Sequence, residues 1–218
     1  MKPCKPHLLD SLPPGGDIAI AVAQAREREE DIQHVRVSNA CLTDLDAHKI
    51  GFTGVEFDHC RLNAGVFDKA SFVDVRFRDC DFSASSFSDA YFSRCEFVTS
   101  KWVGAVFSGA MLRQSMAQGC SFQYTNFDSA SLKGSALREC DCTGAVFSNA
   151  ALHEVETVDN KLIAVNFFHT PLKGMDFTRD LVEGWILSEG LGELKGAVFT
   201  PFQAADLALL LGIKIKNS

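Results

Sequence analysis

The chain has 218 residues, of which 46% are hydrophobic, enough to bury the core of one domain or of two small ones. Its 21 basic and 28 acidic residues give a formal net charge of −7, which argues against a surface that binds nucleic acid phosphates directly. No run of 18 apolar residues occurs, so we expect no transmembrane helix and no membrane association. Prolines and glycines at positions 13–16 interrupt the stretch that would have to form the apolar core of a signal peptide.

Two short segments precede the main body of the chain. Residues 1–16 contain four prolines and are predicted to form a flexible lead. Residues 17–31, with the sequence DIAIAVAQAREREED, are rich in alanine and in charged residues, and Asp17 is placed to act as an N-cap. We expect this stretch to form a short helix or an extended cap, so that residues 1–31 make up an N-terminal lead and cap.

Large apolar side chains recur at every fifth position from residue 32 to residue 187. Fifteen of the 18 phenylalanines fall in this register, and 28 of its 32 positions hold Phe, Leu, Ile, Val or Trp. The four exceptions are Ala47, Ala117, Cys142 and Thr157. A second register lies two residues earlier, and 25 of its 31 positions hold Ala, Cys, Ser, Thr, Gly or Val. The repeating unit is therefore small–x–large–x–x.

A period of five fits neither the α-helix, which repeats every 3.6 residues, nor the β-strand, which repeats every 2. It fits a coil in which each unit forms one side and points its small and its large residue inward. Coils stacked about 4.8 Å apart pair their backbone N–H and C=O groups with the coils above and below. Each buried large side chain then contributes roughly 1.5–3 kcal/mol, before the cost in chain entropy.

Units such as ASFVD (70–74), AYFSR (90–94) and ASLKG (130–134) resemble the A-(D/N)-(L/F)-x-x unit of the pentapeptide repeat proteins. The resemblance runs without a break through about residues 32–187. It implies an all-β fold, a right-handed quadrilateral parallel β-helix with four units per coil. The 32 units would make about 8 coils and a rod roughly 38 Å long. We assign this domain to residues 32–189.

The register slips after residue 189, because Leu194 and Phe199 lie two residues later than the repeat predicts. Residues 190–218 are expected to form a C-terminal segment, with a helix that begins at Pro201 and is capped by Gly212, followed by a strand. In several members of the resembled family such a segment pairs two chains end to end. We therefore expect a homodimer, with a monomer cap as the alternative. The candidate dimer interface consists of Phe202, Leu207, Leu210, Leu211, Ile213 and Ile215.

No set of reactive residues in the sequence has the spacing of an active site or a metal site. The histidines lack ligand spacing, and no G-x-S-x-G, P-loop or H-E-x-x-H motif occurs. Six cysteines fall in the inward registers and are predicted to be buried free thiols in the reducing bacterial cytoplasm, namely Cys60, Cys80, Cys95, Cys120, Cys140 and Cys142. A coil packed with phenylalanine has no room for a substrate pocket, so we expect no enzyme activity, no catalytic residue, no cofactor and no metal.

The outer faces carry the remaining functional signal. Face A is centred on the positions spaced by 20 from Val37 to Phe177, and face B on those from Ala47 to Leu187. Each has a net charge of −3 within residues 36–189, whereas face C, through Phe52 and Phe72, has +2 and the fourth, face D, has −1. The candidate partner-binding acids on face A are Glu56, Asp58, Asp79, Glu96, Glu139, Glu156, Asp159 and Asp176. Those on face B are Asp46, Asp68, Asp89 and Asp128.

The resemblance implies a function for these acidic faces. Quinolone-resistance members of the family are similar to B-form DNA in size, shape and negative charge, and they bind type II topoisomerases. The first expectation is therefore a DNA-mimicking dimer that binds DNA gyrase or topoisomerase IV and modulates the action of quinolones. Plasmid-borne members carry loops that interrupt the repeat, whereas the register here is unbroken, so the loop-free mycobacterial relatives are the closer comparison.

The alternative is a scaffold that binds an unrelated protein partner. Four outward apolar residues recur on face B at every second coil and would supply a contact patch, namely Val66, Val106, Val146 and Ile186. β-branched residues also suit a pleated surface without any partner.

Overall fold

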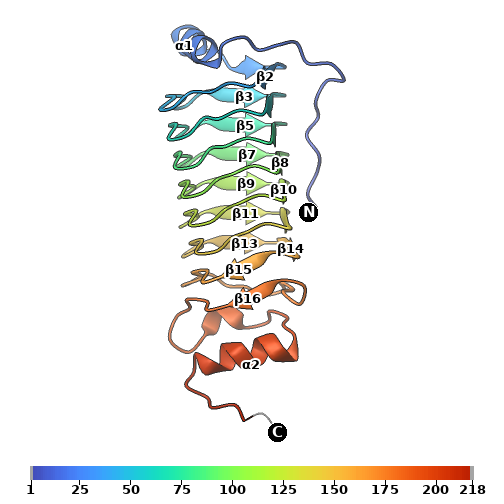
Figure 1. Cartoon of the computed structure of the whole chain (residues 1–218), viewed down its shortest axis with the longest axis vertical. Helices are drawn as coiled ribbons and strands as arrows, with labels where there is room; N and C mark the ends of the chain where they lie inside the picture. The colour runs from blue at the N-terminus through green and yellow to red at the C-terminus, as the bar shows by residue number, and fades with distance from the viewer. Residues whose placement is uncertain (1, 217–218) are drawn as a thin grey trace.

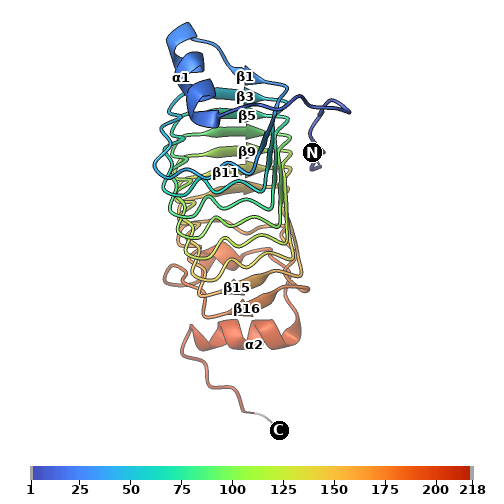
Figure 2. The same ribbon diagram turned by 45° about the horizontal axis from the view of Figure 1, so that its top comes forward.

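Backbone pairing at a spacing of 20 residues organises the structure. The computed structural model describes residues 2–216 and shows a parallel β-solenoid of about eight coils, with a helix at each end (Figures 1 and 2). Phe52 pairs with Phe72, and Phe57 pairs with Phe77, in parallel register. Four five-residue units therefore complete one coil, and the predicted fold is confirmed.

Two seven-stranded parallel sheets form faces C and A. The sheet on face C contains β1 (Ile32–Gln33), β3 (Gly51–Thr53), β5 (Ser71–Val73), β7 (Tyr91–Ser93), β9 (Met111–Arg113), β11 (Ser131–Lys133) and β13 (Ala151–His153). The sheet on face A contains β2 (Arg36–Ser38), β4 (Glu56–Asp58), β6 (Arg76–Arg78), β8 (Glu96–Val98), β10 (Met116–Gln118), β12 (Ala136–Arg138) and β14 (Glu156–Val158). On face D, β15 (Lys161–Ile163) pairs with β16 (Leu181–Glu183). Single bridges join the other coils on faces B and D.

The large inward register forms stacked columns of aromatic rings. The ring of Phe72 lies 5.0 Å from that of Phe52 and 4.7 Å from that of Phe92, with the ring planes nearly parallel. Trp102 and eleven phenylalanines have less than 2% of their surface exposed. These side chains have lost almost all contact with water, and each contributes roughly 1.5–3 kcal/mol of hydrophobic stabilisation.

The small inward register brings side chains within reach of the backbone of the preceding coil. Ser85 Oγ donates to the carbonyl oxygen of Leu62 at 2.9 Å, and Thr125 Oγ1 donates to that of Trp102 at 2.7 Å. The six cysteines predicted to be buried are buried and free. Burial raises the pKa of Cys95 to about 12, so that this thiol stays protonated and unreactive at neutral pH.

Each unit turns its corner at the second residue after the large one. Every fifth residue from His34 to Gly174 has a φ between 45° and 83°. Asn, Asp and Gly tolerate this left-handed backbone best. At Gly54 a Cβ atom would lie 2.5 Å from Nδ1 of His34, so a larger residue there would force the His34 side chain to move.

Small residues in the large register leave voids in the core. A cavity of about 20 Å³ lies at the level of Ala117, between Phe97 and Leu137 of the neighbouring coils. A second cavity, of about 10 Å³, has Thr157 in its wall.

The helix α1 (Ile18–Arg28) closes the N-terminal end. Asp17 Oδ1 accepts a hydrogen bond from the N–H of Ala19 at 2.8 Å, which confirms Asp17 as the N-cap. Ile18, Val22 and Ala25 lie on one face of the helix and are buried. The lead that precedes it was expected to be flexible, but it lies against the solenoid and is hydrogen-bonded to it.

The last coil continues beyond residue 189 with a shift of two residues. Phe199 stacks on Phe177, 22 residues earlier, at a ring distance of 5.3 Å. The shifted coil contains the 3₁₀ helix η1 (Gly192–Leu194), and α2 (Pro201–Leu209) follows it. Within residues 2–216, neither α1 nor α2 is long and apolar enough to cross a bilayer.

The end of α2 differs from the prediction. Leu210, not Gly212, is the C-cap. The N–H groups of Leu210, Leu211 and Gly212 each bond to the carbonyl three residues earlier, so the chain tightens and leaves the α-helix before it reaches the glycine. Residues 213–216 form no strand in this single chain.

Candidate functional site on the charged faces

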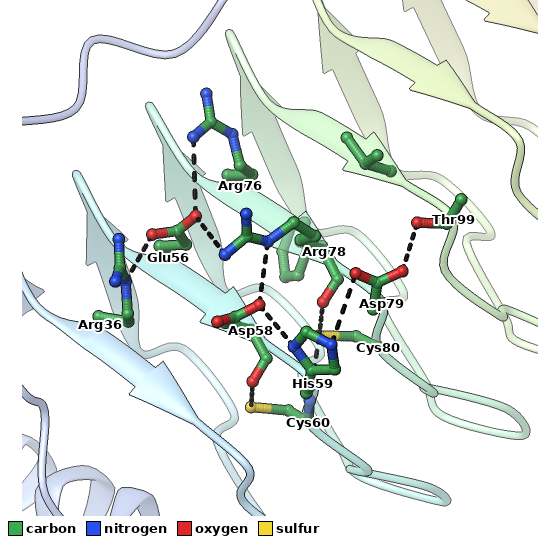
Figure 3. A network of polar contacts seen from close by, with 12 residues as sticks. Arg36, Glu56, Asp58, His59, Cys60, Arg76, Arg78, Asp79, Cys80 and Thr99 are labelled. Atoms are coloured by element: carbon green, nitrogen blue, oxygen red, sulfur yellow. Dashed lines mark hydrogen bonds and ion pairs between the residues drawn. The ribbon is translucent and has the colours of Figure 1, made fainter.

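Arginine and glutamate alternate along face A at a spacing of 20 residues. Arg36 Nε donates to Glu56 Oε2 at 2.7 Å (Figure 3). Arg76 Nε donates to Glu96 Oε2, also at 2.7 Å. Arg76 Nη1 also lies 3.6 Å from Glu56 Oε1. Residues i and i+20 are direct neighbours in this stack, so opposite charges at that spacing neutralise each other. Glu56 and Glu96 are both buried.

A second row of polar groups lies beside this ladder. Arg78 Nε donates to Asp58 Oδ1 at 3.0 Å, and Nδ1 of His59 lies 2.8 Å from the same oxygen. His59 Nε2 lies 3.7 Å from Asp79 Oδ2, and Thr99 Oγ1 donates to Asp79 at 2.6 Å (Figure 3). Burial alone would raise the pKa of Asp58, but the hydrogen bonds from Arg78 and His59 lower it below its usual value.

Asp58, His59 and Asp79 are the one group among residues 2–216 whose donor atoms are close enough to hold a metal ion, all within 4.8 Å of one another. The Arg78 guanidinium is already bonded to Asp58, and its charge opposes that of a bound cation. The arrangement therefore acts as an ion-pair cluster. His59 and Asp79 are 20 residues apart and are therefore vertical neighbours, a spacing that no metal-ligand motif along the chain marks.

The carboxylates toward the C-terminal end of face A are also mostly paired. Arg138 Nη2 donates to Glu156 Oε1 at 2.9 Å, and Arg179 Nη2 donates to Asp159 Oδ2 at 2.5 Å. Gln118 Nε2 donates to Glu139 at 3.3 Å. Asp176 is hydrogen-bonded within its own turn by Thr178. Face A is thus a surface of alternating signs rather than a continuous negative surface.

Face B keeps more of its negative charge, because neutral groups hold its carboxylates. Asp68 accepts hydrogen bonds from the hydroxyl of Ser86 and the N–H of Ser88. Asp128 accepts from Ser148 Oγ at 2.6 Å and Asn149 Nδ2 at 3.0 Å.

The hydrogen bonds from Ser148, Asn149 and Ser129 lower the pKa of Asp128, so it stays ionised. Asp89 is exposed. Asp46 differs from the other three, because Arg26 of α1 pairs with it at 3.1 Å.

The candidate dimer residues divide into two groups. Phe202 is 86% exposed, and Leu210, Leu211, Ile213 and Ile215 are about half exposed. Of these residues, Leu210 and Leu211 line an open hollow, whose wall also contains residues 185–191.

Leu207 does not belong to this exposed set, which corrects the sequence-based assignment. It is only 6% exposed and packs into the core of its own chain. The helix lies across the open end of the last coil, where Gln203 Nε2 donates to the carbonyl oxygens of Phe177 and Asp180 at 2.9 and 2.8 Å. This placement turns the Leu207 side of α2 inward.

Comparison with known proteins agrees with this architecture. A family model described as "Pentapeptide repeat region" matches residues 30–107 and 70–142. No curated protein matches the chain. A trypsin-treated form of QnrB1, a plasmid-mediated fluoroquinolone resistance protein, is similar in structure with a TM-score of 0.56 and 23% identity, covering 84% of this chain and 92% of that one.

A further solved structure is HetL, a pentapeptide repeat protein involved in the regulation of heterocyst differentiation in the cyanobacterium Nostoc. It matches at 16% identity and a TM-score of 0.35, over 82% of this chain and 95% of that one. At such identities the likeness concerns the fold alone. Together with the family model, which covers more than half of the sequence, the 20-residue coil identifies the chain as a member of the pentapeptide repeat family.

Proposed function

We propose that the protein is a non-enzymatic binding module that docks face B on a basic surface of a partner protein. The observation that carries this proposal is the state of the carboxylates. Those of Asp68 and Asp128 are held by hydroxyl and amide donors and keep their charge, whereas Glu56 and Glu96 on face A are neutralised by arginines. A flat charged surface supports steering and docking of a partner of opposite charge.

The cavities within the solenoid support a binding role rather than catalysis. Those in the core, of about 20 and 10 Å³, are far smaller than a site that encloses a substrate. The hollows at the surface are open to solvent, and the one beside β14 has Glu156 and Arg179 in its wall, both of which belong to ion pairs on face A.

Type II topoisomerases are the partner that we propose by name, because their DNA-binding surface is basic and QnrB1 shares this fold. The rod carries less charge per unit length than DNA, so a resemblance to DNA cannot depend on charge alone. The four outer faces carry a net charge of −5 within residues 36–189, which over a rod of about 38 Å is roughly one charge per 8 Å, against about one per 1.7 Å in duplex DNA. The shape of the face must therefore supply part of the binding.

A scaffold for an unrelated protein partner is the second candidate. The observation that favours it is apolar, since Val66 and Ile186 on face B are exposed, and so is the neighbouring Phe168. An interface of this kind would combine an apolar centre with a charged rim.

We also propose that two chains associate through the exposed apolar residues that follow Pro201. Phe202, Leu210 and Leu211 would otherwise leave three large apolar side chains in water at the end of the rod. A homodimer joined there would double the length of face B.

A supercoiling assay with purified gyrase and topoisomerase IV tests the named partner. We expect the protein at micromolar concentration to inhibit supercoiling or to protect the enzyme from a quinolone. The combined variant Asp68→Asn, Asp89→Asn and Asp128→Asn should lose roughly tenfold in potency, since it removes three charges from face B. The matched control Glu139→Gln, Glu156→Gln and Asp159→Asn removes three charges from face A and should retain potency. A wild-type protein that neither inhibits nor protects would reject the topoisomerase as partner.

A further inference from the structure

The first residues of the chain lie along one corner of the solenoid in the way that a bound peptide would. The N-terminal segment leaves the α1 end and runs back beside the coils (Figures 1 and 2). The N–H of Cys4 donates to the carbonyl oxygen of Gln114 at 2.9 Å. The N–H of His7 donates to Asp74 Oδ1, also at 2.9 Å. Gln114 and Asp74 belong to the corner between faces C and A, which we call the C/A corner.

The spacing of these two hydrogen bonds matches the repeat of the solenoid. Asp74 and Gln114 are separated by 40 residues, which is two coils, or about 9.6 Å along the rod. Cys4 and His7 are three residues apart, and three extended residues span about 10 Å. The stretch from Cys4 to His7 therefore presents two N–H groups to acceptors that lie two coils apart.

The acceptor at Asp74 is fixed before any segment arrives. Arg94 Nε and Nη2 donate to the two oxygens of Asp74 at 2.8 and 2.6 Å. Arg94 lies one coil further along the same corner, so these contacts hold the Asp74 carboxylate independently of residues 2–7. Such preorganisation lowers the entropic cost of binding a peptide at this corner.

One buried side chain anchors residues 2–7, and the linker that joins them to the next anchor is longer than the distance it has to span. Pro6 is buried, and proline favours the extended backbone that this alignment needs. The next anchor is Pro13, whose carbonyl oxygen accepts a hydrogen bond from the N–H of Arg36 at 2.8 Å. The six residues from His7 to Pro13 could span about 20 Å, but they advance only about 10 Å along the rod. The segment can therefore leave the corner without disturbing α1.

We propose that the C/A corner is a docking groove for an extended, proline-containing segment of a partner protein, and that residues 2–7 occupy it as a tethered competitor. Two backbone hydrogen bonds and one buried proline make the tethered segment a modest occupant. A partner segment with N–H groups at the same spacing displaces it and takes over Asp74 and the Gln114 carbonyl. The groove is separate from face B, so this proposal stands independently of the proposed function.

The test uses the full chain and a fluorescent peptide that carries residues 2–10 with serine in place of Cys4. His7→Pro removes the N–H that bonds to Asp74, whereas the control His7→Ala removes the same imidazole and keeps the N–H. A tether is made by oxidising the Gln114→Cys variant, so that the new thiol forms a disulfide with Cys4. The Cα atoms of positions 4 and 114 are no more than about 7 Å apart, because the two backbones are hydrogen-bonded to each other.

Fluorescence anisotropy should show the peptide binding the His7→Pro chain at least about tenfold more tightly than the wild type, because more of the groove is open. His7→Ala should behave like the wild type, and the oxidised tether should abolish binding until it is reduced. Equal affinity for tethered and untethered chains, or no binding to His7→Pro up to millimolar peptide, would overturn the proposal. So would unprotected hydrogen exchange at the amides of Cys4 and His7 in the wild type.

Discussion

Asn160 donates two hydrogen bonds to one oxygen of Asp180, from its backbone N–H at 2.8 Å and from Nδ2 at 3.0 Å. Asn160 Nδ2 also donates to the carbonyl oxygen of Leu137, 23 residues earlier, as Ser85 does to Leu62. Polar residues of the small register thus accept from the preceding coil and donate to it. Asp180 can complete this pattern only when it is protonated, and its Oδ2 has no hydrogen-bond partner.

The first prediction concerns the pH dependence that this buried acid creates. Burial raises the pKa of Asp180 in the folded chain. The folded state then binds the proton more tightly than the unfolded state, so the free energy of unfolding should fall as the pH rises from about 3.9 through the folded pKa. Asp180→Asn should remove this component and stabilise the protein at pH 7 by about 1 kcal/mol.

Urea unfolding followed by circular dichroism between pH 4 and pH 8 measures this effect. The control Asp206→Asn removes a charge from an exposed position on α2 and should leave the profile unchanged. Identical profiles for Asp180→Asn and the wild type would contradict the prediction.

The second prediction concerns the core void at Ala117. Ala117→Leu restores a large residue to its column, between Phe97 and Leu137, and should raise the free energy of unfolding by about 1 kcal/mol. The same substitution at Ala105, a fully buried position of the small register, should destabilise by about 1–3 kcal/mol through overpacking. Chemical denaturation distinguishes the two, and a loss of stability in both would show that the void cannot accept the added volume.

The third prediction compares two glutamates at equivalent positions of face A. Glu56 is buried and bonded to Arg36, so Glu56→Gln should lower the free energy of unfolding by about 1–3 kcal/mol. Glu156 and its partner Arg138 are both well exposed, and Glu156→Gln should change stability by less than about 0.5 kcal/mol. Equal losses in thermal or urea unfolding would mean that burial does not set the strength of these pairs.

The fourth prediction separates the two roles of the C-terminal leucines. Leu211→Asp places a charge in the exposed patch and should convert the proposed dimer to a monomer with little change in thermal stability. Leu207→Asp buries a carboxylate beneath α2 and should lower the unfolding temperature of the chain. Light scattering and thermal scans measure both quantities, and a monomeric wild-type protein would refute the dimer.

The architecture could be predicted because the signal is redundant along the chain. Positions such as Phe77 and Phe92 repeat one requirement, a large inward side chain every five residues, and the structure satisfies it at each of them. The end of the regular register was also visible, since Phe199 stacks with the two-residue shift that its position indicates.

The charge that the candidate surface presents to a partner was harder to predict, because the net charge of a face does not show which of its carboxylates are paired with arginines. The order Arg36, Glu56, Arg76 and Glu96 has the 20-residue spacing of vertical neighbours, so the neutralisation of face A could have been found from the sequence. The sequence could not show which side of α2 faces inward, or that Cys4 is hydrogen-bonded to Gln114. Both depend on how a non-repeating segment settles on the solenoid, and the repeat carries no information on that.

The constant 20-residue offset between neighbours also bears on how such a molecule can change over evolutionary time. Loss or duplication of one full turn, for example residues 81–100, would leave every remaining layer stacked on a layer of the same geometry. The distance between the two ends can therefore lengthen or shorten in increments of about 4.8 Å while the cross-section stays constant. The length of such a protein can therefore change under selection, one coil at a time, without any change in how its core is packed.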